Sequence, residues 1–213
     1  MKYLLIAALA FASFINVNAQ NLPNIELNAP EKTGGLTVME AFAKRQSSSE
    51  FGDKELSKQD LSNLLWAANG INRENGKRTA PSSQNSQDID IYVALPQGVY
   101  KFDPKSNNLV PVAESDYRGL AGGKKDNPLP PTILYLVADA SKYTPSAYNT
   151  MEHITNMGKV DAGIVSQNIA IFCSGMGLAT KPRAQMNHAE LKKVLNLSDS
   201  QTLILNHPVG YLE

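Results

Sequence analysis

Two stretches of the sequence concentrate side chains that could bind an anion or a flat polar ligand. The first, KRQSSSEF at residues 44–51, places Arg45 ahead of three successive serines, and the second, GKRTAPSSQNSQ, occupies residues 76–87. Guanidinium and hydroxyl groups suit a phosphate because they donate hydrogen bonds to its oxygens. Hydroxyl and amide groups suit the polar edge of a heteroaromatic ring. On composition alone, a solvated surface loop is the commoner explanation of such stretches.

Other kinds of chemistry find little support in the residue types and their spacing. His153, His188 and His207 lie far apart, and neither an HExxH nor a CxxC pair occurs, so no metal site is predicted. The chain has no GxSxG nucleophile motif and no Walker loop. Cys173, the single cysteine, lies in an apolar helical stretch, where we expect a buried and unreactive thiol. No catalytic triad is therefore predicted.

Length and composition indicate one ordinary globular domain. The chain has 213 residues, 42% of them hydrophobic, and 20 basic residues balance 20 acidic ones. A zero net charge gives no support for nucleic acid or an anionic surface as a general partner. A chain of this length can enclose a core without disulfides, which a single cysteine could not form within the chain.

The N-terminal segment has the features of a secretory signal peptide. Lys2 precedes an apolar run from Leu4 to Ile15, and the small residues Val17 and Ala19 stand three and one positions before an expected cut. A retained membrane anchor is the alternative, but the apolar run is short for a bilayer span. We therefore expect residues 1–19 to be removed and the mature protein to be exported to the periplasm, without stable membrane insertion.

Two short helices are predicted after an extended N-terminal arm at residues 20–36. Thr37 and Glu40 have the spacing of a capping box, and the helix that they begin should end near Lys44. Ser57 is a second N-cap candidate, and apolar residues at helical spacing follow it as far as Asn69. Each polar stretch therefore comes soon after a helix.

The rest of the chain alternates strands with helices. Strands are predicted at residues 89–95, 99–102, 109–112, 131–141 and 202–205. The best helical pattern runs from Ala162 to Met176, with Asp161 in its first turn and with Gly175 and Gly177 at its end. Asn187 should cap one further helix. This order predicts an α+β fold, with one mixed central sheet flanked by helices, across residues 37–213.

Seven segments, in order along the chain, resemble motifs of the nitroreductase family of FMN flavoproteins, and most closely its dehydrogenase-like branch of short chains. They are Arg45-Gln46-Ser47, LSNLLWAANGINR at 61–73, GKRTAPSSQN at 76–85, GVYKFDP at 98–104, a helix with Asp161, Gly163, Gln167 and Asn168, GLAT at 177–180 with Arg183, and PVGY at 208–211. The resemblance covers about residues 37–212. It depends on the number and the order of the motifs and not on any one of them.

The resemblance implies a homodimer with two FMN sites at the subunit interface. One subunit would hold the phosphate and ribityl end with Arg45, Gln46, Ser47 and Ser49, and the other would line the flavin ring with Pro81, Ser82, Ser83 and Asn85. The segment Lys181-Pro182-Arg183 falls where the family's backbone approaches the reactive N5 edge. The implied reaction is hydride transfer from a reduced donor such as NAD(P)H through FMN to a small organic acceptor, which requires no side-chain acid or base.

Departures from the family pattern bear on how tightly FMN is held. Gln46 and Ser49 stand where the family usually has basic residues, and the chain ends soon after PVGY, without the basic pair of many relatives. A cation near the N1–O2 edge stabilises reduced flavin. We therefore expect either Lys77 or Arg183 to replace it or the redox potential to be lower, and we expect weaker FMN affinity.

Two alternatives to an FMN-dependent nitroreductase stay open. The first is a dehydrogenase of the same fold that acts on a peptide or a small metabolite. The second is an exported, non-catalytic dimer that has lost flavin activity. The missing basic residues favour this second alternative, as does a compartment where NAD(P)H is scarce and FMN must be acquired after export.

Overall fold

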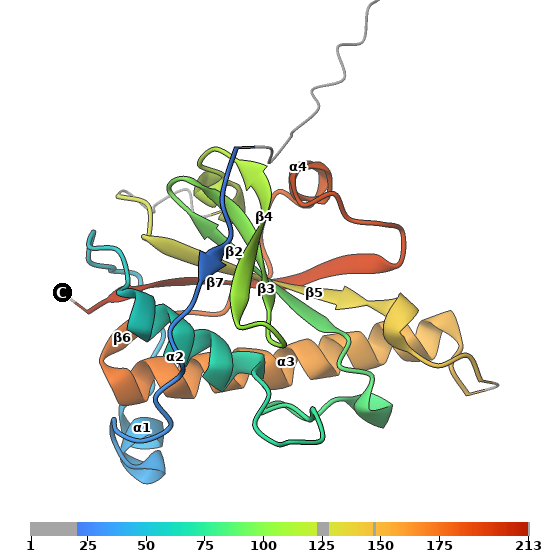
Figure 1. Cartoon of the computed structure of the whole chain (residues 1–213), viewed down its shortest axis with the longest axis horizontal. Coiled ribbons are helices and arrows are strands. Elements are labelled where there is room, and N and C mark those ends of the chain that lie inside the picture. The colour runs from blue at the N-terminus through green and yellow to red at the C-terminus, as the bar shows by residue number, and fades with distance from the viewer. Residues whose placement is uncertain (1–20, 123–127, 147, 213) are drawn as a thin grey trace, which may run out of the picture.

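The computed structural model describes residues 21–122, 128–146 and 148–212, and its centre is one seven-stranded sheet (Figure 1). Each strand pairing is antiparallel, so the sheet is more uniform in direction than the mixed sheet expected from the sequence. The α+β class, with one sheet flanked by helices, is confirmed. In spatial order the strands are β1 (Ile25–Glu26), β4 (Asn108–Glu114), β3 (Gly98–Asp103), β2 (Ile89–Leu95), β5 (Thr132–Asp139), β7 (Gln201–Tyr211) and β6 (Leu178–Thr180).

Helices cover both faces of this sheet. On one face lie α2 (Lys58–Asn69) and the long α3 (Met151–Met176), with α1 (Val38–Lys44) packed on α3 (Figure 1). The short α4 (His188–Val194) lies on the other face. The connections carry three short 3₁₀ helices, η1 (Ser83–Asn85), η2 (Arg118–Ala121) and η3 (Ala140–Lys142).

Alternate residues of β2 divide the interior into two hydrophobic cores. Ile89, Ile91, Val93 and Leu95 pack with α2 and α3. Tyr92 and Ala94 point the other way and pack with α4. Successive side chains of a strand point to opposite faces of the sheet, so a strand between two helical layers is apolar along its whole length. The continuous apolar run of β5 has the same cause.

The predicted caps of α1 and α2 are present. The Thr37 amide donates to the Glu40 carboxylate at 2.9 Å, and the Glu40 amide donates to Thr37 Oγ1 at 3.4 Å, which completes a capping box. The Asp60 amide donates to Ser57 Oγ at 3.0 Å. Each such cap stabilises a helix by about 1 kcal/mol. The segment that follows α1 therefore lies between two capped helices.

The predicted start of α3 was wrong, because the helix begins at Met151, and Asp161 lies well inside it. Its N-cap is Thr150, whose Oγ1 accepts from the His153 amide at 3.2 Å. The first turns carry many exposed polar residues, which concealed the apolar period of the helix. The predicted end needs a smaller correction, since Gly175 is helical and Gly177, with φ of 70°, is the cap.

β7 is longer than the strand predicted at 202–205, and it continues through Pro208 to Tyr211. Its far end pairs with β6, where Leu178 faces Tyr211. β6 was not predicted as a strand because a three-residue strand shows no alternation. The consequence is that the segment after α3 is fixed to the sheet.

The N-terminal arm runs along the outside of the molecule and is tied down at several points. β1 pairs with β4, the Glu31 amide donates to Asn63 Oδ1 at 2.8 Å, and the Leu36 amide donates to the Gly175 carbonyl at 3.0 Å. The predicted signal peptide, residues 1–19, lies outside the described residues. Within the described ranges, no helix has the length and apolar character needed to cross a bilayer.

Candidate functional site

The two polar stretches contact the chain at well-separated points along α3, one near its middle and one just beyond its C-terminal end. The Ser48 amide donates to the Thr180 carbonyl at 3.0 Å, which is three residues beyond the Gly177 cap of the helix. The Ser83 amide donates to Asp161 Oδ2 at 2.9 Å. At a rise of about 1.5 Å per residue, Asp161 and Gly177 are separated by ~24 Å along the helix axis. A single chain therefore does not bring the two stretches into one site.

The segment from Arg45 to Ser48 leaves α1 in an extended form, with alternate side chains on opposite sides, and the chain bends at Ser49. Gln46 and Ser48 line a cavity of about 550 Å³, whose other walls include Ala170 and Ala179. Arg45, Ser47 and Ser49 are exposed and do not line this cavity. This alternation follows from the two-residue period of an extended chain. The predicted phosphate-end residues are therefore divided between two sides of the segment.

Lys181 supplies a cation at the end of this segment. Its Nζ donates to Ser49 Oγ at 3.1 Å. The Arg45 guanidinium, for its part, makes no hydrogen bond or ion pair with any residue that the structure describes. Arg45, Lys181 and the hydroxyls of Ser47 and Ser49 are donors of the kind that suits an anion such as a phosphate. Sequence reasoning looked for the replacement cation at Lys77 or Arg183, and it placed Lys181 in the segment near the N5 edge without giving it this role.

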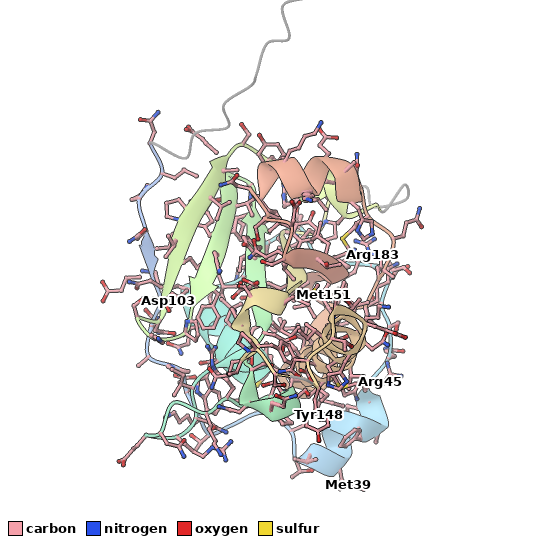
Figure 2. The ribbon with its side chains drawn as sticks, turned by 90° about the vertical axis from the view of Figure 1, so that its right-hand side faces the viewer. Met39, Arg45, Asp103, Tyr148, Met151 and Arg183 are labelled. Atoms are coloured by element: carbon pink, nitrogen blue, oxygen red, sulfur yellow. The ribbon has the colours of Figure 1, made fainter. Side chains whose placement is uncertain are left out.

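Arg183 is bound to β7 by its backbone and its side chain. The Arg183 amide donates to the Asn206 carbonyl at 2.8 Å, and the Arg183 carbonyl accepts from the Asn206 amide at 2.7 Å. The Arg183 Nε donates to Asn206 Oδ1 at 3.2 Å. Pro182 is exposed next to it. Figure 2 shows Arg183 and Arg45 on the same side of the molecule, with Asp103 on the opposite side. The tie to β7 fixes the position of the 181–183 segment.

The loop from Pro81 to Asn85 has a strained backbone that its neighbours hold. Gln84 and Asn85 have φ of 53° and 55°, in the left-handed region that residues other than glycine rarely adopt. The Gln87 amide donates to Ser82 Oγ at 2.8 Å, so this hydroxyl is already engaged within the loop. Pro81, Gln84 and Asn85 remain exposed. The loop therefore presents a preformed polar surface.

His207 is buried, and both of its ring nitrogens contact hydroxyl groups. Its Nε2 lies 2.8 Å from Ser166 Oγ, and its Nδ1 lies 3.1 Å from Thr180 Oγ1. Burial, with a smaller contribution from Arg183, lowers the pKa of His207 to about 3, so the ring is neutral at ordinary pH. Among the described residues, no group of three or more His, Cys, Asp or Glu side chains is placed to hold a metal ion.

Cys173 has the environment expected of an inert thiol. It is fully buried, and burial raises the pKa of the thiol above its ordinary value. The reactive thiolate is therefore disfavoured.

Comparison with known proteins gives the chain its family. A family model described as the nitroreductase family matches residues 42–211. The chain belongs to the nitroreductase family. A candidate nitroreductase from Methanocaldococcus jannaschii is 25% identical over 185 residues, which are 82% of this chain and 91% of that protein.

Solved structures share the fold. The crystal structure of a candidate nitroreductase from Ralstonia eutropha is 31% identical, with a TM-score of 0.80 over 89% of this chain and 90% of that one. A chain in the Escherichia coli microcin synthetase McbBCD complex, solved with truncated pro-MccB17 bound, has a TM-score of 0.69 at 20% identity, over 99% of this chain and 85% of that one. At that identity the second likeness concerns the fold alone.

Proposed function

We propose that this oxidoreductase uses FMN and transfers hydride from a reduced donor such as NAD(P)H to a small organic acceptor. The observation that supports this most directly is the donor set formed by Arg45, Lys181, Ser47 and Ser49. When bound, FMN would supply the hydride chemistry, and the protein would supply binding and orientation. Such chemistry requires no side-chain acid or base.

The residues present fit the chemistry of FMN. Arg45 and Lys181 would neutralise the phosphate, and the hydroxyls of Ser47 and Ser49 would bind its oxygens or those of the ribityl chain. The exposed amide of Asn85 and the loop around it would face the polar edge of the ring. Arg183 would act indirectly, because its contacts with Asn206 fix the backbone of the 181–183 segment.

We propose that the complete site needs two copies of the chain. Within one chain the Pro81–Asn85 loop lies too far from Arg45 to share a ligand of FMN size with it, so a second copy would supply the loop. α1 carries an apolar surface suited to such pairing, since Val38, Met39 and Phe42 are 66%, 77% and 53% exposed. Contiguous exposed apolar side chains mark interaction surfaces.

Export of the protein is a further proposal, supported by the sequence of residues 1–19. An exported chain would bind FMN after export, and it would need an electron donor that is present outside the cytoplasm. N-terminal sequencing of the exported protein would test export, with cleavage after Ala19 as the expected result.

A fluorescence titration of FMN with the mature protein tests the cofactor assignment. We expect saturable quenching at one FMN per chain, and Arg45→Ala should weaken binding about tenfold, which corresponds to about 1.4 kcal/mol. Lys192→Ala is the control, because Lys192 is an exposed cation on α4 that pairs with Asp199. The absence of any FMN binding by the wild-type protein would refute the proposal.

The substrate class is a separate proposal. The substrate that exchanges electrons with the flavin is either a nitro compound, which accepts them, or a peptide or metabolite, which a dehydrogenase oxidises. The substrate of a dehydrogenase, a peptide or a metabolite, would be oxidised and would itself reduce the bound flavin, whereas a nitro compound would be reduced and would reoxidise flavin that a donor has reduced. Anaerobic mixing with each substrate class distinguishes the two by the direction of electron flow.

A further inference from the structure

Two carboxylates are buried together beneath the Pro81–Asn85 loop. Asp88, just before β2, is 1% exposed, and Asp161 of α3 is 3% exposed. Both line the same gap, which has no room for a water molecule. Ser86 Oγ donates to Asp88 Oδ1 at 3.2 Å, while the Ser83 amide and Tyr143 Oη donate to Asp161 Oδ2 at 2.9 and 3.4 Å. Within the described chain, Asp88 Oδ2 is buried without a hydrogen-bond partner.

Among the described residues, the groups that face this pair carry no positive charge. The titratable neighbour that follows η3 is Tyr143, and burial raises its pKa, so it is neutral. Lys142, in η3, is turned to Asp90, to which its Nζ donates at 2.6 Å. From α3, Gly158 approaches the pair, and a methyl group there would lie 3.5 Å from Asp88 Oδ2. Two ionised carboxylates that are both almost fully buried would repel each other strongly.

A single proton shared by the two carboxyl groups would give Asp88 Oδ2 a hydrogen-bond partner and would remove the repulsion between two negative charges. If Asp88 Oδ2 carries the proton, it gains a partner because it can donate to Asp161. The pair then holds one negative charge instead of two, as two close carboxylates elsewhere do. Burial first, and then the charge of Asp161 and its hydrogen bond, raise the pKa of Asp88 to about 6.

We propose that Asp88 and Asp161 share one proton and that this acid–carboxylate pair positions the Pro81–Asn85 loop for its ligand. Asp88 holds Asp161, and Asp161 holds the Ser83 amide at the start of η1. Both are positioning residues, since neither is exposed to a ligand. The inference rests on the proposed function, which assigns this loop to FMN.

The loop needs such an anchor because its backbone is strained. Gln84, Asn85 and Gln87 all have positive φ, of 53°, 55° and 51°, and each left-handed residue costs about 1 kcal/mol or more. When Asp88 ionises, repulsion moves the two carboxylates apart, and Asp161 no longer fixes the Ser83 amide. FMN binding and proton binding to Asp88 therefore strengthen each other by the same factor.

The test compares the pH dependence of FMN affinity in the wild type and in Asp88→Asn. The asparagine amide still donates to Asp161, but it cannot ionise. The phosphate of FMN itself titrates near about pH 6 in every variant, so each profile is read relative to that of Asp88→Asn. We expect wild-type affinity, relative to Asp88→Asn, to fall several-fold between about pH 5 and about pH 8, on either side of the raised Asp88 pKa. Asp161→Asn should run parallel to Asp88→Asn, because its amide accepts from Ser83 and donates to ionised Asp88. Glu114→Gln, a control at an exposed carboxyl group of β4, should follow the wild type. Parallel profiles in the wild type and in both pair variants would overturn the proposal.

A second measurement does not need FMN, so it separates this inference from the cofactor assignment. In an isotope-labelled, ligand-free sample, the amide resonance of Ser83 should titrate near pH 6 in the wild type and stay fixed in Asp88→Asn. A Ser83 resonance that does not move in the wild type would contradict the shared proton even if FMN binds. If the Ser83 resonance titrates but the protein never binds FMN, the shared proton is supported and the proposed function is refuted.

Discussion

Lys181 Nζ donates to Ser49 Oγ at 3.1 Å, across a sequence separation of more than a hundred residues. Ser49 stands where the nitroreductase pattern usually has a basic residue. The structure thus places a cation beside the position from which the sequence has lost one. The tie of Arg183 to Asn206 fixes the backbone on which Lys181 stands. The donor set for an anion depends on β7 and β6 as much as on the end of α1.

Removing the Lys181 ammonium should weaken FMN binding about tenfold, because a charge-assisted contact is worth about 1.5–3 kcal/mol before solvent screening reduces it. Lys181→Ala tests this by FMN titration, and Lys181→Arg should retain most of the affinity. The effect should shrink at high salt, since screening weakens an exposed charge pair. Wild-type affinity in Lys181→Ala would show that Lys181 does not contact the ligand.

The exposed apolar face of α1 should hold the dimer together. Met39→Glu places a charge at a side chain that is 77% exposed in one chain, and we expect it to produce monomers in analytical ultracentrifugation. FMN binding should be lost with the dimer, because the loop of the second copy is lost. Val110→Glu on β4 is the control, at an apolar side chain that is 40% exposed. A Met39→Glu protein that stays dimeric would exclude α1 from the interface.

Elements with strong caps or continuous apolar runs could be predicted from the sequence. The capping box of Thr37 and the run of β5 both appear where the pattern placed them. The start of α3 could not be predicted from the sequence, because its first turns are polar and only the N-cap residue Thr150 marks them. The carboxylate pair was also missed, since Asp88 and Asp161 meet only through tertiary packing. The contact of Lys181 with Ser49 was missed for the same reason, because the two residues are distant along the chain.

Asp88 and His207 should have opposite effects on stability below neutral pH. The raised pKa of Asp88, about 6, makes the folded state bind a proton that the unfolded state lacks, so this contribution to stability is full below the unfolded pKa and is lost as pH rises through 6. The lowered pKa of His207, about 3, makes the unfolded state bind the extra proton, so stability is lost as pH falls below the unfolded pKa of about 6.5.

The two contributions should largely cancel between about pH 4 and about pH 6. In Asp88→Asn only the His207 contribution remains, so its unfolding free energy should fall with acid more steeply than that of the wild type, by up to about 1.4 kcal/mol per pH unit. Urea unfolding at several pH values measures the difference. Equal pH slopes in the two proteins would mean that Asp88 ionises normally in the folded state.

Asp90 joins two lysines at the end of the sheet opposite to Arg45. Lys101 Nζ lies 2.8 Å and Lys142 Nζ 2.6 Å from its two oxygens, and Asp90 is largely buried. Asp90→Asn leaves two partly buried cations without a counter-charge, and we expect a loss of about 1–3 kcal/mol in urea unfolding. Asp199→Asn removes an exposed ion pair, so its loss should be below about 1 kcal/mol. Similar losses in both would show that burial adds nothing to the Asp90 network.

The proposed function is tested most directly by the visible absorbance of the mature protein after incubation with FMN and gel filtration, recorded anaerobically before and after a reduced donor is added. We expect FMN to elute with the dimer at about one per chain, its oxidised band to bleach on reduction by NADH or dithionite, and an organic acceptor to restore the band. A protein that elutes without FMN, or whose bound FMN transfers electrons to no acceptor after chemical reduction, would contradict the proposed function.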